Sequence, residues 1–113
     1  MKYSVKEQQG ISVISLDGSM LGGPEANSLN NELHHLIDHG RKSVIVDLTK
    51  VGLMNSTGLG LLIGGYTALR NAGGRLCLAG ANENIQTLIR ITKLNTIFLS
   101  YPTLEKAIAG LQD

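Results

Sequence analysis

A pair of hydroxyl residues, Ser56 and Thr57, occupies the place in the chain where chemistry is easiest to envisage. The apolar run 44–48 precedes the pair, and apolar residues at helical spacing follow it. The pair therefore lies where a strand-like segment passes into a helix. We expect Ser56 to be the helix N-cap, with its side-chain oxygen accepting a hydrogen bond from the backbone N–H of Gly58 or Leu59.

A hydroxyl at a helix start could act as a switch. The helix N-terminus carries positive partial charge and unpaired N–H groups, so a phosphate attached to Ser56 would be well accommodated. Gly58 and Gly60 leave the first turn almost without side chains, so the backbone of a partner could come close. Ser and Thr are also the commonest N-caps, and by chemistry alone a structural cap is the favoured interpretation.

The wider segment 47–64 resembles the signature of the STAS-domain family of bacterial anti-sigma factor antagonists. In that family an apolar strand leads to Met-Asp-Ser-(Ser/Thr)-Gly-Leu-Gly, and the first hydroxyl of the pair is phosphorylated. The corresponding residues of this chain are Met54, Asn55, Ser56, Thr57, Gly58, Leu59 and Gly60. Segments 71–78 and 91–98 also resemble the family, so the likeness extends over almost the whole chain. The resemblance implies that Ser56 is the phosphoacceptor and Thr57 the weaker candidate.

The function that this resemblance implies is a protein-binding switch. The unphosphorylated domain would bind a kinase-type anti-sigma factor and release the sigma factor. Phosphorylation at Ser56 by that partner would end binding, because it adds roughly −1.5 to −2 charges at a close interface; a serine phosphatase of the PP2C type would be the second partner. The kinase supplies ATP, metal and base, so we expect no enzyme activity and no cofactor. The residues expected to bind the partner are Asn55, Ser56, Thr57, Gly58, Gly60, Gly22 and Gly23.

The chain departs from the family pattern at two places. Asn55 stands where the family usually has Asp, and the loop 18–24 lacks the acidic residue that many antagonists carry there. Both changes remove negative charge from the surface expected to meet the partner. The alternative function is therefore a non-switching STAS-like subunit of a transporter or stress-signalling assembly, in which Ser56 is only a cap and interface residue.

An enzyme with Ser56 as nucleophile is the third possibility, and the sequence argues against it. The Gly-x-Ser-x-Gly pattern is absent, and the three histidines, at positions 34, 35 and 39, precede the strand instead of following it. No Glu-containing zinc motif surrounds the histidines. Cys77 is the single cysteine and lies in an apolar strand pattern, so we expect a core residue. The sequence predicts no catalytic residue and no metal.

Composition indicates one globular domain over residues 1–113. The chain is 42% hydrophobic and 17% charged, and its net charge of +1 comes without the basic cluster that nucleic-acid binding needs. Its longest apolar stretch, 59–66, is interrupted by glycines and too short to insert across a membrane. No charged-then-apolar leader opens the chain, so we expect a cytoplasmic protein. These features leave the oligomeric state open.

Strand and helix patterns alternate along the chain, which predicts an α/β fold with a central mixed sheet of about four to five strands. The family resemblance implies that the helices pack mainly on one face. The expected strands are 2–8, 11–17, 43–48, 75–79 and 96–99, with a glycine-rich loop over 18–23. The expected helices begin near residues 24, 56, 85 and 104, and the first two end at Gly40 and at Gly73-Gly74.

Nine apolar residues are expected to be largely buried: Val44, Val46, Leu59, Leu62, Ile63, Leu76, Leu78, Leu88 and Ile89. Gly60, Gly64 and the adjacent Gly65 lie along one helix. Each costs roughly 0.5–1 kcal/mol relative to Ala, so a steric requirement is expected. Close packing of that face on the sheet is the favoured reason, and a groove for a partner is the alternative.

Overall fold

An antiparallel hairpin opens the fold, as the alternating pattern predicts. β1 (Lys2–Gln8) pairs with β2 (Ile11–Met20), with Gln8 opposite Ile11. Gln9 and Gly10 form the connection with positive φ angles of 53° and 80°. Positive φ at both central residues is the backbone that a two-residue hairpin turn requires.

The hairpin belongs to a mixed sheet of five strands in the order β1-β2-β3-β4-β5. The structure is a computed structural model that describes residues 2–21 and 25–112. β3 (Ser43–Met54), β4 (Arg75–Ala79) and β5 (Leu99–Tyr101) follow β2, and each pairs with its neighbour in parallel. The predicted fold class, a mixed sheet of four or five strands, is confirmed.

β2 and β3 both run past the ends predicted for them, at residues 17 and 48. Gly18 pairs with Val51, and Met20 pairs with Met54, across two shifts of register. The start of the predicted glycine-rich loop is therefore strand. The sequence pattern did not predict that β3 continues, because positions 49 and 50 are both polar. A strand that crosses a bulge does not keep strict alternation. The longer β3 carries the chain directly to the start of the next helix.

The strand predicted over 96–99 is wrong in its position. Leu94–Thr96 form a short 3₁₀ helix, η1, and the strand begins three residues later than predicted. Lys93 takes a left-handed backbone with φ 62°, and the N–H of Phe98 donates to the carbonyl of Leu94 at 2.9 Å. This helical turn buries the Phe98 side chain, which explains why apolar residues cluster before the strand.

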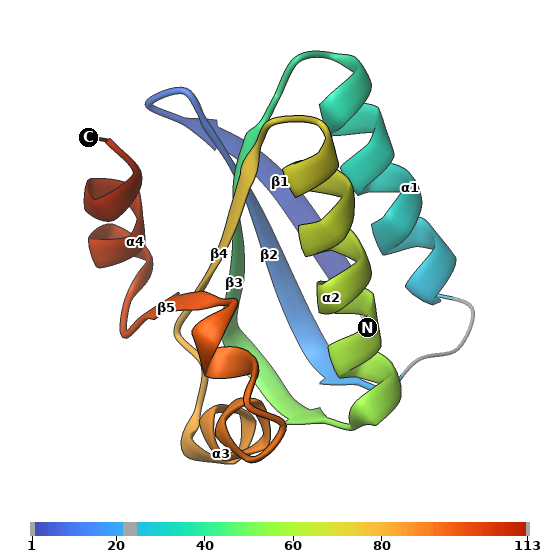
Figure 1. The fold of residues 1–113 in the computed structure, drawn as a ribbon, viewed down its shortest axis with the longest axis vertical. Coiled ribbons are helices and arrows are strands. Elements are labelled where there is room, and N and C mark those ends of the chain that lie inside the picture. Colours follow the sequence, from blue (N-terminus) through green and yellow to red (C-terminus); the bar gives the residue numbers. More distant parts are fainter. Residues whose placement is uncertain (1, 22–24, 113) are drawn as a thin grey trace.

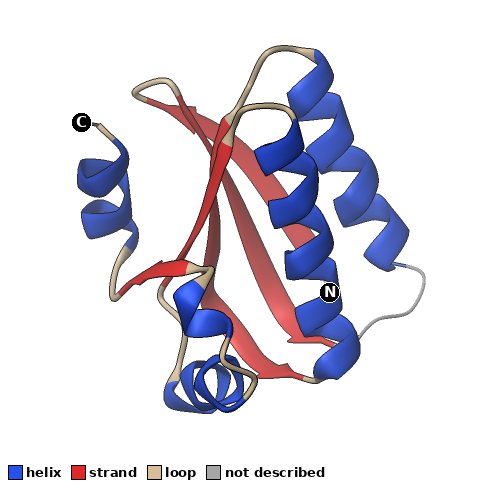
Figure 2. Cartoon of the chain, in the orientation of Figure 1, coloured by secondary structure: helices blue, strands red, loops and turns tan. Residues whose placement is uncertain are grey.

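Helices cover both faces of the sheet, three of them on one side. α1 (Glu25–Asp38), α2 (Ser56–Asn71) and α3 (Glu83–Ile91) supply apolar residues to one buried cluster with the sheet. α4 (Leu104–Leu111) packs against a second, smaller cluster on the opposite face. Figure 2 shows α4 separated from α1 and α2 by the sheet. Helices packed mainly on one face are therefore confirmed.

The end of α2 has the glycine geometry that the sequence predicts. Gly73 has φ 82°, its N–H donates to the carbonyl of Arg70 at 3.0 Å, and the N–H of Gly74 donates to that of Leu69 at 2.6 Å. These two bonds form a Schellman motif, which satisfies the last helix carbonyls. The predicted boundaries of β4 are also confirmed.

Seven of the nine predicted core residues are buried, all except Ile63 and Leu88. Leu88 is partly buried against the main cluster. Ile63 is 37% exposed, so its prediction is wrong. The buried side of α2 is formed by Gly58, Leu59, Leu62, Gly65 and Leu69, and this spacing turns position 63 toward solvent.

We predict that Leu62→Ala lowers the free energy of unfolding by roughly 2–5 kcal/mol, because it leaves a cavity in a packed core. Leu62 is 1% exposed, whereas its neighbour Ile63 is 37% exposed. Urea denaturation of both alanine variants checks this, with Ile63→Ala as the control that should cost much less. Equal losses for the two variants would contradict the assigned orientation of α2.

Candidate functional site

The predicted hydroxyl pair lies at the exposed first turn of α2. Ser56 is the first residue of the helix, and both Ser56 and Thr57 are exposed. The expected N-cap role of Ser56 is wrong. Asn55 is the N-cap, with an extended backbone, and its Oδ1 accepts the N–H of Gly58 at 2.9 Å. Asn caps a helix as well as Ser does, so the residue one position earlier takes that role and leaves the Ser56 hydroxyl free of it.

This turn offers an anion an electropositive setting. Within the described residues, the N–H groups of Ser56 and Thr57 donate to no acceptor, and the first turn of α2 contains no acidic residue. Both features favour a negative group at the helix N-terminus. A phosphate on Ser56 would sit next to these two free donors.

Gly58 joins this turn to the end of β2. Its α-carbon lies so close to the backbone carbonyl of Met20 that a Cβ atom would collide with the carbonyl oxygen. The N–H of Asn55 also donates to the carbonyl of Met20, at 3.2 Å. Figure 1 shows the end of β2 beside the first turn of α2. Gly58 is buried, so the structure gives it a packing role, and its part in partner binding stays a prediction.

Three large apolar side chains are exposed: one shortly before this turn in the chain, one along α2, and one at Leu21, whose carbonyl accepts a hydrogen bond from Asn55. Leu21 is 49% exposed, Leu53 is 56% exposed and Ile63 is 37% exposed. Together with Ser56 and Gly60 they form what we call the Ser56 surface. The sequence analysis predicted Ile63 to be a core residue and did not identify Leu21 or Leu53 as surface residues.

The helix glycines divide into two kinds. Gly65 packs closely against Leu33 of α1, so the predicted steric reason holds there. Gly60 and Gly64 are exposed, and a Cβ on either would meet open space. Packing on the sheet is therefore the wrong reason for Gly60 and Gly64, because that side of α2 faces away from the sheet.

The remaining predicted partner-binding residues, Gly22 and Gly23, lie outside the described residues. The residue before them, Leu21, is brought to the site by a side-chain contact. The Nδ2 of Asn55 donates to the carbonyl of Leu21 at 3.3 Å. The end of β2 and the start of α2 thus lie together, and the partner-binding role of Gly22 and Gly23 stays a prediction.

The other reactive side chains do not form a second site. His34, His35 and His39 are exposed on and just after α1, and no group of three or more metal-binding side chains occurs in the described residues. Cys77 is buried in β4. Burial raises the pKa of the Cys77 thiol to about 11, although the positive charge of Arg75 partly opposes this. At neutral pH the thiol is protonated and is a poor nucleophile.

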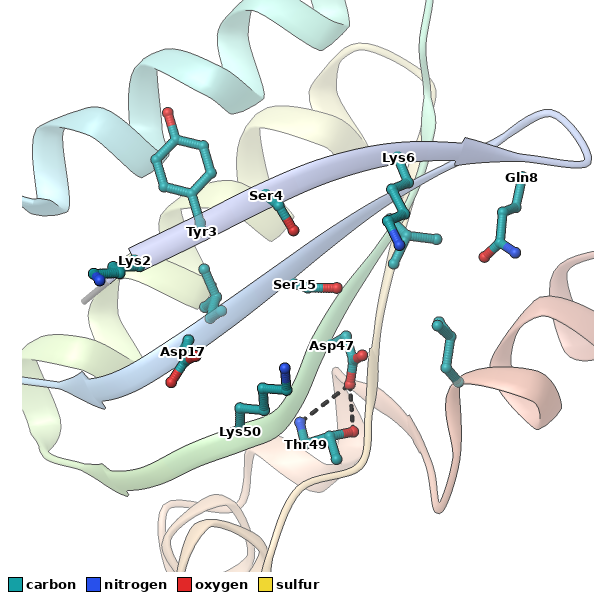
Figure 3. A pocket seen from close by; sticks show the side chains of 13 residues that line it. Lys2, Tyr3, Ser4, Lys6, Gln8, Ser15, Asp17, Asp47, Thr49 and Lys50 are labelled. Carbon is teal, nitrogen blue, oxygen red and sulfur yellow. Dashed lines mark hydrogen bonds between the residues drawn. The ribbon is translucent and has the colours of Figure 1, made fainter.

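A hollow lies elsewhere, on the sheet face formed by β1, β2 and β3 (Figure 3). Its volume is about 540 Å³, and charges of both signs line it, including Lys6, Lys50, Asp17 and Asp47. Asp47 is already held by hydrogen bonds from the backbone N–H and the hydroxyl of Thr49, at 3.1 and 2.5 Å. Ser56 does not line this hollow.

In the described part of the chain, no helix is long and apolar enough to cross a membrane.

Comparison with known proteins identifies the family of this chain. The family model of the STAS domain matches residues 2–107. The anti-sigma-B factor antagonist of Listeria monocytogenes is 40% identical over 52 residues, a segment that spans 46% of this chain and 46% of that protein.

Solved structures agree on the fold. An anti-sigma factor antagonist from Mycobacterium paratuberculosis superposes with a TM-score of 0.87 at 24% identity, covering 99% of this chain and 94% of the other. The Bacillus cell fate determinant SpoIIAA in its phosphorylated form superposes with a TM-score of 0.77 at 19% identity, covering 98% and 100%. The chain belongs to the STAS domain family, and the relatives it resembles include anti-sigma factor antagonists.

Proposed function

We propose that this protein is an anti-sigma factor antagonist whose binding to a kinase-type anti-sigma factor is ended by phosphorylation of Ser56. The observation that carries the proposal is the exposed Ser56 hydroxyl at the first position of α2, beside the N–H groups of Ser56 and Thr57, which donate to no acceptor among the described residues. A kinase could reach this hydroxyl without unfolding any part of the chain. The relative SpoIIAA has been solved in a phosphorylated form, which supports a switch of this type.

The surroundings of Ser56 explain how one phosphate could end binding. Leu53 is exposed shortly before it in the chain, Ile63 is exposed along α2, and Leu21 is exposed and bonded to Asn55. Such side chains gain most when a partner covers them. A phosphate among them would have to lose water on binding, and it adds roughly −1.5 to −2 charges. The same phosphate suits the helix N-terminus, so it disfavours the complex without disturbing the fold.

Gly60 and Gly64 support a partner surface along α2. Each costs roughly 0.5–1 kcal/mol in a helix, and no packing against the described residues requires either one. A partner helix or backbone that lies against α2 would require both. The proposal includes residues 1–113 as one STAS domain, a cytoplasmic location, no enzyme activity of its own, and a serine phosphatase of the PP2C type that restores the binding form.

The experiment is incubation of the protein with its cognate anti-sigma kinase and ATP, followed by mass spectrometry of its peptides. One phosphate on Ser56 is the expected result, and the phosphorylated protein should no longer bind the kinase. Phosphate on Thr57 alone would move the site by one residue. With a demonstrably active kinase, no phosphate on either hydroxyl would overturn the switch and favour a non-switching subunit of a transporter or stress-signalling assembly.

A further inference from the structure

Asn55, the residue at which this chain departs from the family pattern, uses every polar group it has. Its Oδ1 accepts the N–H of Gly58 at 2.9 Å, and its Nδ2 donates to the carbonyl of Leu21 at 3.3 Å. Its backbone N–H donates to Met20 at 3.2 Å, and its carbonyl accepts from Leu59 at 2.9 Å. The side chain therefore caps α2 and at the same time holds the chain that leaves β2.

Only a side chain with both a donor and an acceptor can make the two side-chain bonds together. An Asp carboxylate accepts only, so it could keep the cap on Gly58 but could not bond to the Leu21 carbonyl. It would also place a negative charge against that carbonyl oxygen. Ser is neutral and caps equally well, but its short hydroxyl cannot span to Leu21 while it accepts from Gly58. The two substitutions thus remove the same bond, one with an added charge and one without.

We propose that Asn55 is a positioning residue, which holds Leu21 in the Ser56 surface so that the anti-sigma factor meets one preformed patch. This rests on the proposed function. Leu21 is 49% exposed and belongs to the first residues after β2, where no strand pairing fixes it. The hydrogen bond from the side-chain amide of Asn55 holds Leu21 instead. A partner that covers Leu21 and Ser56 together gains affinity because Leu21 is already ordered.

The chain contains a matched control at the start of α3. Asn82 caps that helix by accepting the N–H of Ile85 at 2.9 Å, and its Nδ2 donates to the carbonyls of Val51 at 3.3 Å and Gly52 at 3.1 Å. Asn82 is exposed, like Asn55. Its side chain also combines a helix cap with hydrogen bonds to another segment, which is β3 and not Leu21. Substitutions at position 82 therefore carry the same chemistry without touching the link between Leu21 and Ser56.

The experiment compares Asn55→Ser and Asn55→Asp with Asn82→Ser and Asn82→Asp in the full chain. The carbonyl ¹³C chemical shift of Leu21 reports the bond directly. Both Asn55 variants should move it, and both Asn82 variants should leave it and move the shifts of Val51 and Gly52. A Leu21 carbonyl shift unchanged in Asn55→Ser would overturn the inference, and this readout needs no partner.

The second readout is binding and phosphorylation by the cognate anti-sigma kinase. The loss of one ordering hydrogen bond should raise both Kd and KM roughly two- to tenfold in Asn55→Ser, with kcat unchanged. The Asn82 variants should change Kd and KM less than Asn55→Ser does, because they alter the strand before Leu53 and leave the Leu21 hydrogen bond intact. If Asn55→Ser binds like the wild type and only Asn55→Asp is weakened, charge is the cause and the positioning role is wrong. A wild-type chain that is not phosphorylated would overturn the proposed function. The Leu21 carbonyl shift would still show whether Asn55 forms the hydrogen bond to Leu21.

Discussion

Ser56→Ala is expected to abolish phosphorylation while leaving the unphosphorylated chain able to bind the anti-sigma factor. The hydroxyl makes no hydrogen bond to the described residues, and Asn55 supplies the cap. The free energy of unfolding should therefore stay within about 0.5 kcal/mol of the wild type. Ser56→Asp should weaken binding only in part, because Asp carries one negative charge and lacks the shape of phosphate. Kinase assays with mass spectrometry and titration of the partner measure both effects.

Thr57→Ala is the matched control for the Ser56 variants. Thr57 is equally exposed in the same turn, so its loss tests whether any hydroxyl at this end of α2 will serve. It should leave phosphorylation at Ser56 intact. Phosphate that appears on Thr57 in the Ser56→Ala variant, at the wild-type rate, would show that the kinase selects the turn and not the residue.

Gly58→Ala should cause the largest loss of stability among the glycine substitutions in α2. In an open helix position this change stabilises by roughly 0.5–1 kcal/mol, since Ala has the better helix propensity. At Gly58 the added methyl would collide with the Met20 backbone carbonyl, which cannot rotate away as a side chain can. The sign therefore reverses, and we expect a loss of roughly 1–3 kcal/mol as the helix shifts from β2.

Gly60→Ala and Gly64→Ala provide the controls for Gly58→Ala, because an added Cβ meets open space at both positions. Urea denaturation should show both controls at or above wild-type stability. Both should nevertheless weaken partner binding if the partner lies along α2. A Gly58→Ala variant as stable as these two would mean that the first turn of α2 moves away from β2 at little cost.

The sequence predicted the order of elements because their patterns are local. The apolar run of β4 and the glycines after α2 each carry their own signal, and their predictions hold. Predictions failed where a distant segment decides the outcome. The extension of β3 to Met54 depends on its pairing with β2, and the exposure of Ile63 depends on which side of α2 meets the sheet.

The predictions for the candidate site also divide between local patterns and contacts with distant segments. The place of Ser56 at a helix start could be predicted, since the change from strand to helix pattern marks it. The identity of the cap could not, because Asn55 and Ser56 cap equally well and the contact with the end of β2 favours Asn55. The exposed Leu21 and Leu53 could not be found from pattern either, because an apolar residue that awaits a partner looks the same in sequence as one that belongs to the core.

The unoccupied positive end of α2 also affects how long each form of the protein persists. Its first turn contains no acidic residue, so a phosphate at Ser56 would be the first negative group there. Such a group stabilises a helix by roughly 0.3–1 kcal/mol, which lowers the unfolded population about two- to fivefold. The form that cannot bind the partner is then the more resistant to proteolysis. A cell could hold the protein in that durable form through long quiet periods, and the active form released by a phosphatase would be the one that turns over.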